Sequence, residues 1–332
     1  MSNKQQNLLQ TSSKRVIANL IKSKVSLAPM AGITDYVMRS LIRSFSSDAL
    51  LTTEMISSEY LAQARESVIT KIDESHHPIN FQISGHKPYL MKLAAEQLTP
   101  YADMIDINMG CPVNKVVKGQ DGCSLMRAPE LAAEIVKSVK DGTDKPVSVK
   151  FRLGYTSEEM NYVEFGQKMQ EAGADFITIH ARTRAQMYSG SADWKAIRLL
   201  KNNVDIPVFA NGDIKTVQDA IECIKVSGAD GVAVGRAAMG DPTLIGRIES
   251  CFASGKIIPE PSLGEKIEIL KKHLDGEIEL RGEKVGIKFM RKFYPHYIAG
   301  IKNASKIRSI LVLEEDYSNI ISTLDKLKDY QA

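Results

Sequence analysis

The chain has few cysteines, no apolar run long enough to cross a membrane, and little net charge. Its four cysteines show neither a CxxC pair nor a His/Cys ligand spacing, so neither a zinc site nor a disulfide framework is supported. The polar start of the chain lacks the apolar core of a signal peptide, and a net charge of +3 does not by itself indicate nucleic-acid binding. We therefore expect a protein of the reduced cytoplasm, with no membrane segment and no bound metal.

Two phosphate-binding fingerprints are also missing. No GxGxxG follows an apolar strand, and no GxxxxGK followed by Ser or Thr is present, so the Rossmann and P-loop classes have no support. The remaining composition is ordinary, with 332 residues, 43% hydrophobic and 25% charged. A chain of this length accommodates one large α/β domain and a smaller appendage.

Short apolar segments recur along the chain at about the 30-residue spacing of a βαβ repeat. The expected strands are Val25–Pro29, Ala49–Thr53, Pro78–Ile83, Met104–Asn108, Pro146–Phe151, Phe176–His180, Pro207–Ala210 and Gly231–Val234. Amphipathic helical stretches such as Leu131–Val139, Tyr162–Ala172 and Val217–Val226 lie between them. Because the strands are rich in Val, Ile and Ala, we expect them to be apolar on both faces. The pattern predicts a (β/α)8 TIM barrel over residues 25–255, after a polar lead (1–24) and before a smaller C-terminal helical domain (256–332).

The fourth expected strand ends abruptly at a cysteine. Gly110 and Pro112 break the strand on either side of Cys111, and a long loop, Pro112–Arg127, follows. Catalytic groups collect at the carboxyl ends of strands in alternating α/β proteins. From these residues alone, a catalytic cysteine and a buried structural cysteine are equally good interpretations.

Polar residues gather where other strands end: Gln82, Lys150, Arg152, His180, the run Asn211-Gly212-Asp213, and the pair Gly235-Arg236. The last two groups fit a phosphate site after strands seven and eight, although Asn-Gly-Asp alone is also a good turn. Lys150 indicates a functional site because a buried, unpaired ammonium is costly, the alternative being a salt-bridged core lysine. His180 is either a ligand contact or a satisfied core histidine.

A phosphate site beside a lysine, without a dinucleotide fingerprint, suggests flavin mononucleotide (FMN). Reduced nicotinamide and substrate can react in turn at one flavin face, so a separate dinucleotide domain is not required.

Taken together, these motifs resemble the tRNA-dihydrouridine synthase family, and most closely its bacterial B-type branch. The resemblance rests, in order, on Ala28–Asp35, Asp106–Pro112, Lys115–Lys118 with Gly122, Lys150–Arg152, His180–Thr183, Asn211–Asp213 and Gly235–Ala238. It covers roughly residues 25–300. Ala181 and Cys123 depart from the residues usual in the family, which affects loop packing and no catalytic role.

The resemblance implies a cofactor, a reductant and roles for individual residues. Pro29, Met30, Ala31, Gln82 and Lys150 would hold the flavin ring, and His180, Asn211, Gly212, Asp213, Gly235 and Arg236 the ribityl phosphate. Reduction of the uracil C5–C6 bond in tRNA would take a hydride from FMN to C6 and a proton from Cys111 to C5, with NADPH or NADH as reductant. A thiol is suited to this acid role, and the charge of Lys150 would stabilise the anionic reduced flavin.

The C-terminal part favours RNA independently of the resemblance. A 25-residue window, residues 284–308, holds seven basic residues and no acidic ones, with aromatic residues interleaved. Lys284, Lys288, Arg291 and Lys292 follow helical spacing and would form one basic face, while the aromatics would either stack on bases or pack the helices. A solvated helix face is the alternative. Predicted substrate contacts are these four residues together with Asn108, Lys115, Lys118, Arg182 and Arg184.

Two other classes remain open. A small-molecule flavin oxidoreductase, such as a dihydropyrimidine or dihydroorotate dehydrogenase, would act on free pyrimidines and would not need the basic tail. A non-redox phosphate-binding barrel using Lys150 as a Schiff base would be colourless. No stable protein partner is implied, and the sequence leaves the reduced uridine, the oligomeric state and the choice between NADPH and NADH undetermined.

Overall fold

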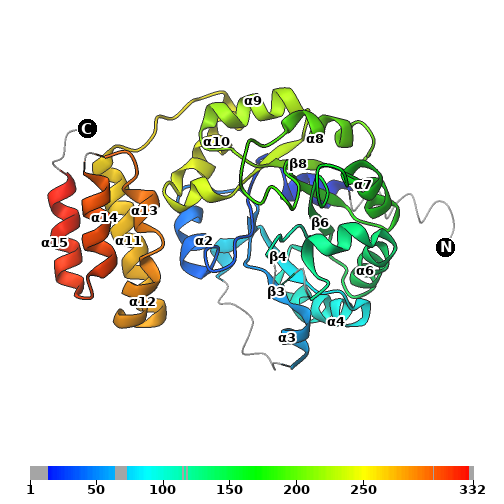
Figure 1. Ribbon diagram of the computed structural model, residues 1–332, viewed down its shortest axis with the longest axis horizontal. Coiled ribbons are helices and arrows are strands. Elements are labelled where there is room, and N and C mark those ends of the chain that lie inside the picture. Colours follow the sequence, from blue (N-terminus) through cyan, green and yellow to red (C-terminus); the bar gives the residue numbers. More distant parts are fainter. Residues whose placement is uncertain (1–13, 64–72, 114–115, 117–118, 302, 329–332) are drawn as a thin grey trace.

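The centre of the molecule is a barrel of parallel strands (Figure 1). The computed structural model describes residues 14–63, 73–113, 116, 119–301 and 303–328. The strands are β1 (Val25–Leu27), β2 (Leu51–Thr52), β3 (Ile56–Ser57), β4 (Ile79–Ser84), β5 (Met104–Met109), β6 (Val147–Arg152), β7 (Phe176–His180), β8 (Val208–Asn211) and β9 (Gly231–Val234). Their order is β1-β9-β8-β7-β6-β5-β4-β2, and a bridge between Ser26 and Leu50 nearly closes the ring. The predicted TIM barrel is confirmed.

Each of the eight expected strand segments contains a strand. The second differs most, because it is continued by a separate piece. Both β2 and β3 pair with β4, at Ile79 and Asn80 for the first and at Ile83 and Ser84 for the second.

Helices surround the barrel and present apolar faces to it. They are α2 (Tyr36–Arg43), α3 (Ser58–Gln63), α4 (Pro88–Leu98), α6 (Pro129–Asp141), α7 (Tyr162–Glu171), α8 (Trp194–Lys201), α9 (Val217–Ser227) and α10 (Thr243–Ser254). Short 3₁₀ turns are η1 (Glu74–His76), η2 (Thr99–Tyr101), η3 (Gly122–Arg127) and η4 (Arg236–Met239). In α6 the buried residues Ala132, Ile135, Val136 and Val139 follow the i, i+3, i+4, i+7 spacing of one helix face.

Toward the carboxyl ends of the strands the inner face of the barrel is polar, so our expectation of strands apolar on both faces was wrong there. In β4, Ile79, Phe81 and Ile83 belong to the main hydrophobic core, whereas the alternate residues Asn80 and Gln82 are buried polar groups. Hydrogen bonds join this inner set across strands. Successive side chains of a strand face opposite sides, so in β4, β5 and β6 one set of side chains packs against the helices and the alternate set carries the polar groups.

The amino-terminal end of the barrel is closed by a helix that our interpretation of a polar lead did not include. Residues 14–20 are helical, and Ile17, Leu20 and Ile21 are buried. They form a separate apolar cluster with Leu50, Met104, Phe176 and Phe209. The cluster fills the barrel end opposite to the strand carboxyl ends.

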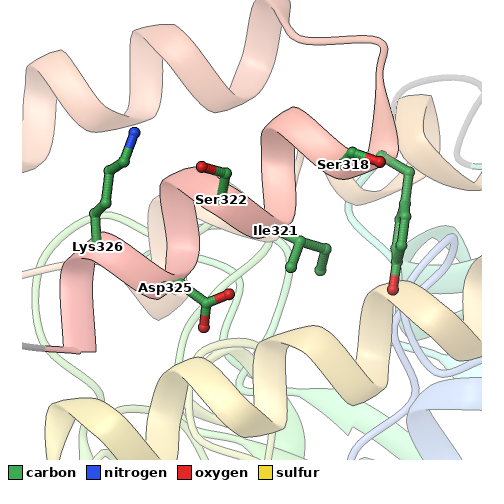
Figure 2. A pocket seen from close by; sticks show the side chains of 6 residues that line it. Ser318, Ile321, Ser322, Asp325 and Lys326 are labelled. Carbon is green, nitrogen blue, oxygen red and sulfur yellow. The ribbon is translucent and has the colours of Figure 1, made fainter.

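A bundle of helices follows the barrel and lies beside α2 and α10 (Figure 1). Its helices are α11 (Leu263–Arg281), α12 (Glu283–Met290), α13 (Tyr294–Tyr297), α14 (Ala304–Leu313) and α15 (Tyr317–Lys328). Figure 2 shows Ile321 and Asp325 of α15 directed toward α11, where Asp325 pairs with Lys271. The segment between α10 and α11 comprises residues 255–262, next to our proposed domain boundary. The assignment of this bundle as a tRNA-binding domain stays a prediction.

Candidate active site

One cavity of about 840 Å³ opens at the carboxyl ends of the strands. All eleven residues predicted to hold a cofactor line it, together with Cys111, Asn108 and Arg182. They come from the strand ends and loops after β1, β4, β5, β6, β7, β8 and β9. The barrel therefore gathers residues that are more than 200 positions apart in the chain, as the strand-end pattern predicted. Their individual roles stay predictions.

Cys111 lies in a tight turn directly after β5. The side-chain oxygen of Asn108 accepts hydrogen bonds from the backbone N–H groups of Gly110 (3.3 Å) and Cys111 (3.0 Å). The carbonyl of Cys111 accepts a hydrogen bond from the N–H of Cys123 (3.1 Å). Cys111 is partly exposed, whereas the three other cysteines are buried. This placement in the cavity wall favours a functional cysteine over a structural one.

The returning loop needs a glycine against Cys111. Gly122 has φ of +62°, and a Cβ there would lie 2.7 Å from the Cys111 carbonyl oxygen and 3.0 Å from its Cβ. Both the left-handed backbone and the close contact exclude a side chain at this position.

Beneath the cavity, a polar network fixes the residues of the wall. Asn108 donates to Gln82 Oε1 (2.8 Å), and Gln82 donates to Asp106 Oδ2 (2.6 Å). Ser148 donates to Asp106 Oδ1 (2.5 Å). Burial raises the pKa of Asp106 above its usual value. Asn108, which we expected to contact substrate, thus has both ends of its side chain committed inside the protein.

Lys150 and His180 lie on the adjacent strands β6 and β7 and differ in charge, because the lysine is cationic and the histidine is neutral. The ammonium of Lys150 donates to Asn211 Oδ1 (3.3 Å). Burial, together with the neighbouring charge of Arg152, lowers the pKa of Lys150 to about 8. Burial and the positive charges of Arg152 and Lys150 hold the pKa of His180 well below its usual value, so its imidazole is neutral at pH 7.

The corner after β8 and β9 is arranged around the Asp213 carboxylate. Asp213 Oδ2 accepts hydrogen bonds from Arg182 (2.6 Å) and from the N–H of Ala192 (2.8 Å), and Arg236 lies 3.6 Å from Oδ1. Burial alone would raise the pKa of Asp213, but these donors hold it below its usual value. Gly212 has φ of +120°, and a Cβ there would lie 2.9 Å from the Cβ of Ala192. Asp213 therefore orders the loop, and the Arg236 side chain remains 48% exposed toward the cavity.

Arg182, which we expected to contact substrate, is buried. Its side chain is only 1% exposed. Besides the pair with Asp213, it donates to the carbonyls of Ser189 (3.1 Å) and Gly190 (2.6 Å). These contacts hold its guanidinium on the loop after β7, and its contact with substrate stays a prediction.

Sequence reasoning missed two aromatic side chains of the cavity wall. Tyr188 is 50% exposed, and its ring lies 4.8 Å from the Arg236 guanidinium and 5.6 Å from that of Arg152. His296 comes from the bundle and lines the same cavity. Tyr188 lies on the loop after β7 and His296 in α13. Their exposure to the cavity is decided by folding, and no local signal in the sequence distinguishes them from other aromatics.

The predicted basic face of residues 284–292 is divided in the structure. Lys284 and Lys288 are exposed, but Glu315 lies 3.5 Å from Lys288 and 3.3 Å from Arg291. Lys292 turns away and donates to the carbonyl of Gly32. The four residues therefore do not form one free basic stripe. Helical spacing does not report which acids fold back from later in the chain, and the substrate contacts expected of these four residues stay predictions.

Three aromatics of the window 284–308 pack the bundle, which was one of the two alternatives, whereas His296 faces the cavity. Phe293, Tyr294 and Tyr297 are buried.

Arg184, another predicted substrate contact, lies over the ring of Tyr155 at 5.1 Å, and Arg127 lies over the same ring at 3.5 Å. Lys115 and Lys118 lie outside the described residues.

A second pocket lies on α15 and has none of these features. It is lined by Tyr317, Ser318, Ile321, Ser322, Asp325 and Lys326, all from one helix (Figure 2).

Within the described ranges, no three His, Cys, Asp or Glu residues are grouped so as to hold a metal ion. Among the helices that the structure describes, none has the length and apolar character needed to span a membrane.

The fold and the cavity define a TIM-barrel protein with a polar cavity at the carboxyl ends of its strands, and comparison with known proteins identifies its family. The family described as dihydrouridine synthase (Dus) matches residues 26–330. The chain is 41% identical over 293 residues to a probable tRNA-dihydrouridine synthase 1 of Synechocystis sp., covering 88% of this chain and 82% of that protein. It is 36% identical over 293 residues to tRNA-dihydrouridine synthase B of Pseudomonas aeruginosa, covering 87% and 88%. The chain belongs to the dihydrouridine synthase family and to its bacterial B-type branch.

Proposed function

We propose that the protein is a tRNA-dihydrouridine synthase that uses FMN and is reduced by NADPH or NADH. The observation that carries this proposal is the single cavity in which a partly exposed thiol, a strand-end lysine and a half-exposed arginine meet. Its membership of the dihydrouridine synthase family supports the reaction.

The cavity fits a flavin mononucleotide. A volume of about 840 Å³ lies in the range of small-molecule sites. At one end, Arg236 and the glycine backbone of the β8 and β9 loops suit a phosphate. Lys150 and Gln82 line the cavity where the polar edge of the flavin ring would lie. Pro29, Met30 and Ala31 also line it. When bound, the flavin supplies the hydride for the uracil C6 position.

The protein's own residues supply the proton and the electrostatics. Cys111, held by the Asn108 turn, would give its Sγ proton to C5 of the uracil. The ammonium of Lys150, fixed on Asn211, would stabilise negative charge at the ring edge of the cofactor. Neutral His180 adds a hydrogen-bonding group without adding a charge.

The tRNA would approach across the cavity mouth and the bundle. Lys284 and Lys288 offer exposed ammonium groups for phosphates. Arg184 belongs to the loop after β7, whose residues Arg182 and Tyr188 line the cavity. Lys115 and Lys118 belong to the loop after Cys111, so we retain them as proposed RNA contacts.

The test separates the two half-reactions. Purified protein should be yellow, and Cys111→Ala should still be reduced by NADPH but form dihydrouridine in tRNA about 10²–10⁴-fold more slowly, the usual effect of losing a general acid. Cys251→Ala, which lies in α10 outside the cavity, is the matched control and should keep full activity.

Three outcomes would contradict the proposal. Colourless protein would favour the Schiff-base barrel. Activity on free uridine with no tRNA dependence would favour the small-molecule flavin enzyme. Wild-type turnover in Cys111→Ala would remove Cys111 from the acid role.

The phosphate corner is tested by flavin retention. Arg236→Ala should weaken FMN binding by about 1.5–3 kcal/mol, the range for a hydrogen bond to a charged group. Equilibrium titration of the apoprotein measures this, and unchanged affinity would place the phosphate elsewhere.

A further inference from the structure

Gly32 has both of its backbone hydrogen-bonding groups held by charged side chains. It follows Pro29, Met30 and Ala31 in the loop between β1 and α2, which lines the cavity. Its N–H donates to Glu54 Oε1 (2.5 Å), and its carbonyl accepts from the ammonium of Lys292. Glu54 belongs to the barrel and Lys292 to the bundle, so the loop is held from two parts of the molecule.

The ammonium of Lys292 is held in place by its surroundings. It lies 3.2 Å from the ring centroid of Phe289 and 5.3 Å from that of Phe293. A cation over an aromatic face is favoured, and more so when partly withdrawn from water. Burial lowers the pKa of Lys292, although the nearby Asp35 and Glu277 carboxylates oppose this.

We propose that Lys292 is a positioning residue that fixes the loop between β1 and α2 (the ring loop) at Gly32 and so couples the helical bundle to the flavin site. The proposal rests on the proposed function, because it assumes that FMN binds against Pro29, Met30 and Ala31. It replaces our expectation that Lys292 contacts an RNA phosphate.

Coupling of this kind is reciprocal. If the bundle orders the ring loop through Lys292, a bound flavin must stabilise the bundle by the same free energy. The flavin site and α12 are then one thermodynamic unit, although FMN would touch no residue of α12.

Two measurements on the full chain test the proposal. FMN titration of the Lys292→Met apoprotein should give a roughly tenfold weaker Kd, as expected for loss of one charged hydrogen bond near the ligand. Lys292→Arg keeps a donor and should recover most of the affinity. In wild-type protein, FMN should slow hydrogen exchange of the backbone amides of α12, whose Phe289 ring lies under the Lys292 ammonium, and Lys292→Met should reduce that effect.

Lys271→Met is the matched control. Lys271 is a largely buried lysine of α11 that pairs with Asp325 and lies 3.5 Å from Glu268, away from Gly32. Its loss should lower the stability of the bundle without changing the FMN Kd. A purely structural role for Lys292 would make the two variants behave alike.

The outcomes are distinguishable. If FMN binds the wild type and Lys292→Met with equal affinity, or leaves α12 exchange unchanged in the wild type, the positioning role is wrong. If Lys292→Met loses only tRNA affinity, Lys292 is an RNA contact. If wild-type protein binds no FMN, the proposed function fails instead.

Discussion

Lys150 illustrates how a single residue can be destabilising in the fold and useful in the site. Its ammonium is partly withdrawn from water inside the barrel, and the nearby Arg152 opposes its charge. The buried Asp106 carboxyl below it is held by Gln82 and Ser148. A site that must receive negative charge benefits from such a poorly solvated cation, because electrostatic interactions are stronger where water is excluded.

The lowered pKa of Lys150 has a consequence for stability. Below pH 8 the lysine is charged in both the folded and unfolded states, and burying that charge destabilises the folded state. Between pH 8 and 10.5 the folded protein releases the proton while the unfolded chain keeps it, so stability rises with pH. The rise should be at most about 3.5 kcal/mol, because the pKa falls from 10.5 to about 8 and one pKa unit corresponds to roughly 1.4 kcal/mol.

Urea unfolding of the apoprotein across this pH range measures the effect. Lys150→Met is the reference protein, because subtracting its unfolding free energy removes the contribution of all other titrating groups. Above pH 8, the unfolding free energy of the wild type should increase relative to that of Lys150→Met. A pH-independent difference would show that Lys150 titrates normally.

At the scale of single elements, the helix at residues 14–20 is a structural plug for the barrel. Ile17 is 4% exposed and packs in the cluster with Phe176 and Phe209. Ile17→Ala should reduce the free energy of unfolding by about 2–4 kcal/mol, the usual cost of truncating a buried aliphatic side chain. Thermal or urea unfolding measures this.

Val16 provides the control on the same helix. Its side chain is 45% exposed, so Val16→Ala should stay within about 0.5 kcal/mol of wild type. Flavin binding should be unaffected in both variants, because the plug lies at the opposite end from the cavity. Equal effects of the two substitutions would contradict the packing assignment.

Helix α12 shows how an acid distant in sequence changes a basic surface. Glu315 lies between Lys288 and Arg291 and competes with any phosphate. Glu315→Gln should strengthen tRNA binding and make its salt dependence steeper. Lys284→Met with Lys288→Met should weaken binding and flatten the log–log salt slope by roughly 0.7–0.9 per lost phosphate contact.

Binding titrations across a salt series measure both changes. Glu260→Gln removes an acid from the segment before α11, where Glu260 lies 3.6 Å from Lys266, and should change neither affinity nor slope appreciably. If Glu315→Gln behaves like Glu260→Gln, the RNA surface lies elsewhere.

At the scale of the whole molecule, the barrel and the bundle are joined by a buried charged cluster. Arg281 of α11 pairs with Asp35, which caps α2, and donates to Glu277 Oε2 (2.6 Å). Glu277 is fully buried and lies 3.6 Å from His273, whose pKa is lowered to about 4 by burial. Burial and the nearby Glu277 raise the pKa of Asp35. One arginine therefore serves two carboxyls across the interface.

Removing that arginine should be costly. Arg281→Met leaves two neighbouring buried carboxyls unpaired, and we expect a loss of about 3 kcal/mol in unfolding free energy at pH 7. The loss should shrink as the pH falls toward the raised pKa of Asp35, because protonation removes the charge repulsion. Lys266→Met, which removes a surface pair, should cost under about 1 kcal/mol at either pH. A pH-independent loss for Arg281→Met would show that charge is not its cause.

The sequence by itself determined the barrel and the polar strand-end residues of the cavity. Strand and helix periodicities are local, and a parallel barrel places every strand end on one face, so Cys111, Lys150 and Arg236 could be predicted from the sequence alone. The turn at Cys111 was likewise readable from Gly110 and Pro112, which lie beside it in the chain.

Only the tertiary structure decided which charges remain free. Lys292 donates to a carbonyl 260 positions away, Arg281 reaches Asp35 across 246 positions, and Glu315 folds back 24 positions onto Arg291. The same holds for Ile17, whose helix contacts strands from four parts of the chain. Composition and spacing report the type of a side chain and its local face. Its partner is set by packing between distant segments, and that partner decides whether Lys292 meets RNA or orders a loop.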